Sequence, residues 1–171
     1  MKGMPNYLLG VLCCIFLLCG RGHAQDDFGK WNQNYAAVDP VELLKAEQHY
    51  ADSMEAVHGK TEYYYRADKY RFEAIYLGLR RSLEPEVMRS MKNVLGMVTG
   101  NAGQLDGLVE NEYLFQVGEQ RIWAPMQRQL ETPFAEEVRN GDTVLLYCLF
   151  LNEYSGSGLY NTFLISEFLK E

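Results

Sequence analysis

The chain has little cysteine outside its first two dozen residues. Of the four cysteines in 171 residues, Cys13, Cys14 and Cys19 lie within Met1–Ala24, and only Cys148 lies in the remainder. A single thiol excludes an internal disulfide there, so the fold has to be stabilised by its core. We expect Cys148 to be a buried apolar side chain because all its neighbours from Val144 to Leu151 are apolar.

Other features are also missing after Ala24. This part of the chain holds two histidines, no Asn-x-Ser/Thr sequon, and no apolar run longer than the eight residues Val144–Leu151. A membrane-spanning helix needs about 20 apolar residues, so none is expected here. The missing sequon excludes the standard acceptor for N-glycosylation. The glycines Gly100, Gly103 and Gly107 fit no nucleotide-binding spacing, and no internal repeat is present.

Met1–Ala24 has the pattern of a secretory signal. Lys2 supplies a positive start, Tyr7–Gly20 is a 14-residue apolar stretch, and Gly22-His23-Ala24 places small residues where a signal peptidase reads. We therefore expect residues 1–24 to be a signal peptide. The product is then secreted or periplasmic, typical of a bacterial cell envelope, with no membrane span once the signal is removed.

Lipidation at Cys19 is the weaker alternative. A lipoprotein signal needs a small residue directly before the cysteine, and Leu18 occupies that position. An uncleaved anchor is weaker still, because the apolar stretch is short for a bilayer.

Charge is distributed unevenly along the chain. Removal of residues 1–24 takes away two cations and no acid, which changes the net charge from −7 to −9. An acidic exported protein is a poor match for nucleic acid, so no nucleic-acid partner is expected. Residues 60–92 nevertheless carry a net charge of +3 and are interleaved with tyrosines.

Aromatic rings beside Arg and Lys can bind a glycan or an acidic partner protein. The residues that we expect to bind are Tyr63, Tyr64, Tyr65, Arg66, Tyr70 and Arg71. In the alternative interpretation, the tyrosines belong to the core and the cations pair with the acids of this same chain.

The region after the signal divides into a tether and one domain. Residues 25–38 are polar with no clear period, and we expect a flexible tether. Asp39, Pro40 and Glu42 form a helix start, and Gly59 supplies its stop. A second helix is predicted from Thr61 to about Ser82, although its tyrosines would also suit a strand.

Residues 84–98 are predicted as a third helix, because Pro85 suits a first turn and the apolar residues that follow have helical spacing. A glycine-rich loop follows. The strands are then expected at 112–117 and 121–129, joined at Gly118-Glu119, and at 143–151 and 160–168, with one helical turn at 134–139.

These elements indicate a single α+β domain over residues 39–171, with a helical part at 39–99 and a β-rich part at 110–169. We expect about three N-terminal helices packed on a C-terminal antiparallel β-sheet or small β-barrel.

Candidate chemistry is sparse. Glu110 and Glu112 would share one face of a strand, and paired carboxylates can hydrolyse a glycosidic bond. His49 and His58 fall on opposite sides of the first predicted helix, which argues against a metal site. We expect no catalytic residues, no metal and no cofactor. The sequence thus favours a non-catalytic binding module for a protein or glycan partner, with a carboxylate-dependent envelope hydrolase as the alternative.

Overall fold

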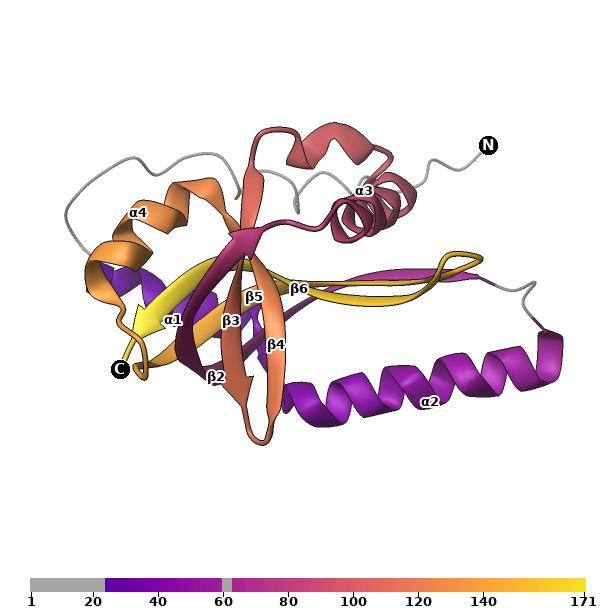
Figure 1. Cartoon of the computed structure of the whole chain (residues 1–171), viewed down its shortest axis with the longest axis horizontal. Helices are drawn as coiled ribbons and strands as arrows, with labels where there is room; N and C mark the ends of the chain where they lie inside the picture. Colours follow the sequence, from indigo (N-terminus) through magenta and orange to yellow (C-terminus); the bar gives the residue numbers. More distant parts are fainter. Residues whose placement is uncertain (1–23, 60–62) are drawn as a thin grey trace, which may run out of the picture.

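The computed structural model describes residues 24–59 and 63–171, which form four α-helices and a six-stranded mixed sheet (Figure 1). The prediction of a signal peptide or of lipidation falls on residues 1–24, nearly all of which lie outside the described residues. The elements are α1 (Ala24–Asn34), β1 (Ala36–Ala37), α2 (Pro40–His58), β2 (Tyr64–Ser82), α3 (Pro85–Thr99), a 3₁₀ turn (Ala102–Leu105), β3 (Val109–Val117), β4 (Gln120–Gln127), α4 (Arg128–Glu137), β5 (Thr143–Ser155) and β6 (Gly158–Lys170).

The predicted helix at 61–82 is wrong, because this segment contains the 19-residue strand β2. Its alternate side chains are covered on two faces: Phe72 and Ala74 enter the main core, whereas Tyr65 and Ala67 pack against the apolar cluster beneath α3. Because both faces of β2 carry apolar residues, the segment lacks the alternation of apolar and polar residues that marks a half-buried strand. The segment's many aromatic residues, which favour strands, were the correct indication.

Strand β2 changes its partner at Ile75 and bends a few residues later, at Gly78. It pairs with β5 from Tyr64 to Ile75 and with β3 from Ile75 to Ser82, with a register shift between Tyr76 and Arg80. Gly78 has a φ of +72°, and a Cβ added to it would lie 2.9 Å from Cβ of Asn140. Glycine therefore meets both a conformational and a steric requirement of the bend.

The sheet is mixed rather than antiparallel. β1 pairs in parallel with β2, and β4 pairs in parallel with β6 at the single position Met126–Ile165. The sheet curls until β2 borders both β3 and β5, but that single β4–β6 pair leaves it short of a clear barrel. The helices are not all N-terminal either, since α4 lies between β4 and β5.

The predicted starts of the helices before and after β2 are confirmed. Asp39 Oδ1 accepts hydrogen bonds from the amides of Val41 and Glu42 at 2.9 and 3.2 Å, and α2 begins at Pro40. Capping of this kind satisfies amides that a helix start leaves unpaired. Pro85 begins α3, also as predicted, although Glu84 makes no side-chain cap.

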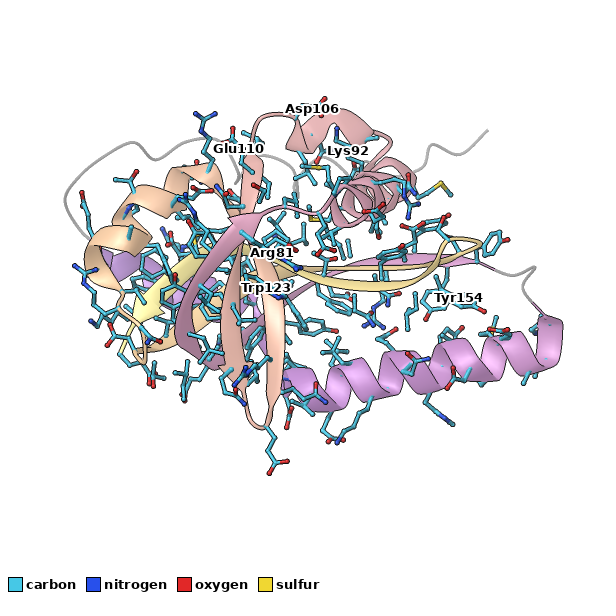
Figure 2. The ribbon with its side chains drawn as sticks, in the orientation of Figure 1. Arg81, Lys92, Asp106, Glu110, Trp123 and Tyr154 are labelled. Carbon is cyan, nitrogen blue, oxygen red and sulfur yellow. The ribbon has the colours of Figure 1, made fainter. Side chains whose placement is uncertain are left out.

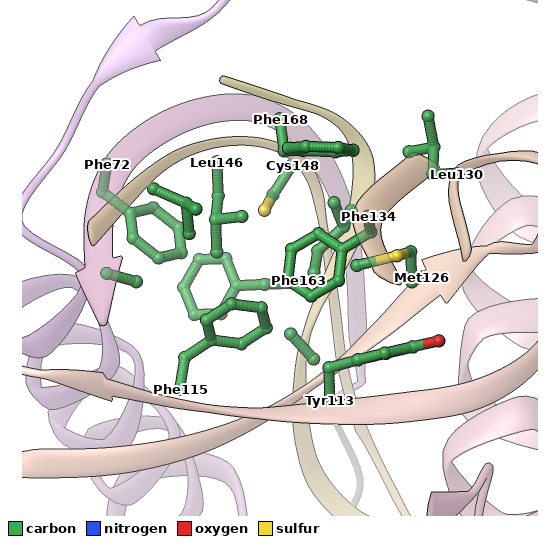
Figure 3. Packing of buried hydrophobic residues seen from close by; sticks show 14 of the residues in the cluster. Phe72, Tyr113, Phe115, Met126, Leu130, Phe134, Leu146, Cys148, Phe163 and Phe168 are labelled. Atoms are coloured by element: carbon green, nitrogen blue, oxygen red, sulfur yellow. The ribbon is translucent and has the colours of Figure 1, made fainter. Parts of the chain in front are cut away.

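Two apolar clusters stabilise the sheet. The main core gathers aromatic side chains from strands and α4, including Phe115, Phe134, Phe163 and Phe168 (Figure 3). Cys148 lies among them with no exposed surface, as predicted. The second cluster joins α3 to β5 and β6 through residues such as Met91 and Leu164. Burial of these side chains supplies the stability that a disulfide-free domain needs.

Residues 25–38 form α1 and β1 instead of the predicted tether. Phe28, Trp31 and Tyr35 surround the ring of Tyr147 on β5, with centroid distances of 6.0, 5.6 and 5.6 Å. The Tyr147 hydroxyl donates to Asn32 Oδ1 at 3.0 Å. The aromatic spacing of three and four residues matches one helix face, and this signal was overlooked in the sequence.

Candidate functional site: a free strand edge and a pocket

The six predicted binding residues lie together along the chain but are divided by the alternation of β2. Tyr63 precedes the strand and is half exposed. Tyr64, Arg66 and Tyr70 point to one face of β2, and Tyr65 and Arg71 point to the other, because successive strand residues face opposite sides. They therefore do not form one patch.

Tyr64 lies within an aromatic stack. Its ring is 4.9 Å from that of Tyr50 on α2 and 5.5 Å from that of Tyr154 on β5. Burial raises the pKa of Tyr64 to about 12. The Tyr64 ring thus packs between α2 and β5, with the rings of Tyr50 and Tyr154 against it.

Arg66 is held by acids of its own chain. Its Nη2 lies 2.8 Å from Oε1 of the buried Glu47, and its Nε lies 2.6 Å from Oδ2 of Asp68. Its guanidinium is also 5.5 Å from the centre of the Phe150 ring. These contacts agree with the alternative interpretation of residues 60–92, in which the cations pair with acids of the same chain.

The other predicted residues contribute to packing. Tyr70 packs against Phe150 at 5.9 Å, and Tyr65 contacts the cluster beneath α3. Arg71 holds α1, since its Nη1 donates to the carbonyl of Asn32 at 2.9 Å and to that of Tyr35. Of the four predicted tyrosines, Tyr63 alone is as much as half exposed.

Residues Tyr64–Lys69 form what we call the free edge of β2. These residues pair with β5 on one side, and within the part of the chain that the structure describes no strand pairs with them on the other. The amide of Val38 donates to the carbonyl of Arg71 at 3.1 Å, so the polar backbone groups of Arg71 face away from β5. Because these groups alternate along a strand, those of Tyr65, Ala67 and Lys69 face the same way.

A pocket of about 700 Å³ lies further along the same side of β2, where α2 begins beside the β3–β4 turn. Figure 1 shows this turn next to the start of α2. Its lining residues are Val38, Asp39, Pro40, Val41, Lys45, Phe72, Glu73, Val117, Gly118, Glu119 and Gln120. We call this the α2-start pocket. It combines an apolar floor with several charged side chains, a composition found in many binding pockets.

Glu110 and Glu112, the acids considered for hydrolysis, have different environments. A bulge at the start of β3 shifts the register between Val109 and Asn111. Glu110 is exposed and pairs with Arg128 at 3.0 Å, whereas Glu112 is only 1% exposed. In Figure 2, Glu110 lies apart from Arg81 and Trp123, the residues around Glu112.

Glu112 belongs to a charged cluster that sequence reasoning missed. Its Oε2 accepts from Arg81 Nε at 2.8 Å, and Arg81 Nη1 also lies 2.7 Å from Oε1 of Glu84. Burial raises the pKa of Glu112, and the charge of Arg81 opposes that rise. The available signal was an acid at the start of the predicted strand 112–117, directly before a run of mostly apolar residues.

A second buried acid, Glu153, joins β5 to α3. Its Oε1 accepts from Asn93 Nδ2 at 3.2 Å and from Ser155 Oγ at 2.7 Å. Its Oε2 and the hydroxyl of Ser90 are both buried and have no hydrogen-bond partner among the described residues. The bond from Asn93 links α3 to β5, whereas the two unpaired groups carry a cost, since buried polar groups are costly unless they are paired.

Residues His49, Asp52, Glu55 and His58 lie on α2 and are exposed. Within 24–59 and 63–171, no group of three or more histidine, cysteine or acidic side chains is placed to hold a metal ion. None of the helices in these ranges has the length and apolar character needed to cross a membrane.

Comparison with known proteins gives no match to a family model, to a curated protein or to a solved structure. We therefore infer function from the site geometry.

Proposed function

We propose that this chain is an exported, non-catalytic binding protein whose partner is a polypeptide. The partner adds as a β-strand to the free edge of β2. The observation that carries this proposal concerns the backbone groups of Tyr65, Ala67 and Lys69. The β2–β5 register turns them toward the free side, where no described strand pairs with them. The export part rests on the sequence of residues 1–24 alone.

The free edge has the length that strand addition needs. Six residues at about 3.3 Å each give an edge of roughly 20 Å, comparable to an ordinary strand. β1 pairs only with Tyr70 and Arg71, so it limits the edge at one end. An uncovered strand edge is a template for another chain, and several peptide-binding domains use it in this way.

The side chains around the free edge favour a polypeptide over a glycan. A glycan site needs aromatic faces open to solvent, but Tyr64 lies between Tyr50 and Tyr154, and Tyr70 packs in the core. Strand addition depends on backbone groups, and no described strand pairs with those of Tyr65, Ala67 and Lys69 on this side.

The carboxylate hydrolase has no comparable support. Glu110 and Glu112 each pair with a different arginine, and no observation brings them to one substrate position. We therefore retain the binding function as our proposal.

A pair of substitutions at Ala67 tests strand addition. Ala67→Pro removes the amide that faces the free side and leaves the bonds to β5, since proline is tolerated where an edge amide points to solvent. Ala67→Val is the matched control because it keeps the amide and suits a strand. Peptides selected from a random display library on the wild-type chain are then measured by fluorescence anisotropy against all three proteins.

We expect the selected peptides to bind the wild-type and Ala67→Val chains equally and the Ala67→Pro chain at least tenfold more weakly. Hydrogen exchange at Tyr65, Ala67 and Lys69 should slow when peptide is bound. Equal binding to the Ala67→Pro chain, with its thermal unfolding unchanged, would refute the proposal. A library that yields no binder would also count against it.

A further inference from the structure

We propose that the α2-start pocket is a second binding site, which takes a lysine or arginine side chain of a polypeptide together with an adjacent apolar side chain. This site is separate from the free edge of β2, because β1 lies between them on the same side of the strand. The inference does not depend on strand addition.

The floor of the pocket is apolar. Phe72 and Val117 are almost fully buried there, at 5% and 8% exposure. Val38 and Val41 pack against the same core and line the wall beside them. An apolar side chain placed on this floor would lose contact with water and gain contact with the core, which favours binding.

The charges around this floor are mainly negative. Glu73 on β2 and Glu119 in the β3–β4 turn are both exposed, and no basic side chain among the described residues lies within 4 Å of either carboxylate. The one lining cation, Lys45, is occupied by Glu42 at 2.8 Å. Two uncompensated carboxylates beside an apolar floor are complementary to a cationic group on an apolar stem.

Backbone geometry indicates a polypeptide rather than a small organic cation. Phe72, Glu73 and Ala74 pair with β5, but neither β1 nor β3 pairs with them on the pocket side. The carbonyl of Arg71 faces β1, so by alternation the amide and carbonyl of Glu73 face the same side, into the gap between β1 and β3. A peptide can use this donor and acceptor in addition to the carboxylates.

The experiment measures binding of a short labelled peptide of alternating lysine and leucine to the full exported domain by fluorescence anisotropy. The test variant is Glu73→Gln with Glu119→Gln. The matched control is Glu136→Gln with Glu137→Gln, which makes the same change in net charge at two exposed residues of α4, outside the pocket.

We expect the dissociation constant to rise at least tenfold in the pocket variant and to stay within twofold of wild type in the control. A peptide with serine in place of leucine should bind more weakly, because it leaves the apolar floor uncovered. The Ala67→Pro chain should bind the lysine–leucine peptide normally, which separates this site from the free edge of β2.

Equal weakening in both double variants would show only general attraction to an acidic protein and would overturn the proposal. Binding of a glutamate–leucine peptide with the same affinity would overturn it as well. Thermal unfolding of each variant confirms that the fold is retained, and neither glutamine pair removes an ion pair within the described residues.

Discussion

The guanidinium carbon of Arg81 lies 4.2 Å from the centre of the Trp123 ring. The ring covers one face of the cation, and the Nε of Arg81 donates to the buried carboxylate of Glu112. A cation over an indole ring gains from the ring's negative face. Arg81 thus compensates the negative charge of the buried Glu112 on β3. Arg81, Trp123 and Glu112 therefore act as a unit.

Replacement of Arg81 should be costly. Arg81→Met leaves Glu112 buried without its cation, and we expect the free energy of unfolding to fall by about 3 kcal/mol. The double variant Arg81→Met, Glu112→Gln should recover much of this loss, because it removes the uncompensated charge. Urea unfolding of the three proteins measures the effect, and no recovery in the double variant would contradict the explanation.

The stability of the Arg81→Met variant should also depend on pH. Burial already raises the pKa of Glu112, and loss of Arg81 raises it further. A carboxyl whose pKa is higher in the fold than in the unfolded chain stabilises the fold below the unfolded value, and this contribution is lost as pH rises through the folded value. The variant should therefore lose stability, relative to wild type, as pH rises above about 4.3. Urea unfolding at a series of pH values tests this, and parallel profiles would contradict it.

Tyr35 and Tyr64 should ionise at a higher pH than an ordinary tyrosine. Burial raises the pKa of Tyr35 and of Tyr64 from 10.0 to about 12. The protonated forms are favoured in the fold, so stability should fall as pH rises from 10 toward 12. Phenolate absorbance during an alkaline titration measures this, with Tyr35→Phe and Tyr64→Phe identifying each group. If all the tyrosines ionised together near pH 10 in the folded protein, the burial of these two would be disproved.

The bend in β2 should depend on Gly78. Gly78→Ala places a Cβ against Asn140 at a positive φ, and we expect a loss of about 2 kcal/mol in unfolding free energy. Gly29→Ala is the control: its Cβ meets nothing within 4 Å in helix α1, so stability should be unchanged or slightly higher. Thermal unfolding compares the two variants, and equal effects would argue against the bend.

The thiol of Cys148 should be unreactive in the folded protein. It has no exposed surface, and burial raises its pKa. A thiol reagent should label it only after unfolding, because the thiolate is the reactive form. Cys148→Ser should destabilise more than Cys148→Ala, since a buried hydroxyl without a partner costs a further 1 kcal/mol, roughly. Rapid labelling under native conditions would contradict the burial.

The sequence predicted the helices whose ends carry local signals. Asp39 and Pro40 start α2, and Pro85 starts α3, through interactions within a few residues. β2 was not predicted as a strand because its structure depends on partners that are distant in the sequence. β5 pairs with Tyr64–Ile75, and β3 pairs with the remainder. Propensity within a window cannot report such contacts.

The sites were harder to predict for the same reason. The sequence selected Tyr63–Arg66 by residue type, whereas the free edge depends on backbone pairing at Tyr65 and Ala67. The α2-start pocket draws residues from three separated segments, so no motif could reveal it. Glu110 and Glu112 have the expected spacing of two, but the bulge at the start of β3 separates them.

The pairing of β2 with β5 has a consequence for the order of folding. Tyr64 pairs with Tyr154, and Ile75 pairs with Thr143, so the two strands meet across a long stretch of intervening chain. During synthesis from the N-terminus, β2 emerges well before β5 and has to wait for it. Long loops slow such pairing because their closure costs entropy first. Folding should therefore be late and slow, completed only when residues 143–170 are free to join the sheet.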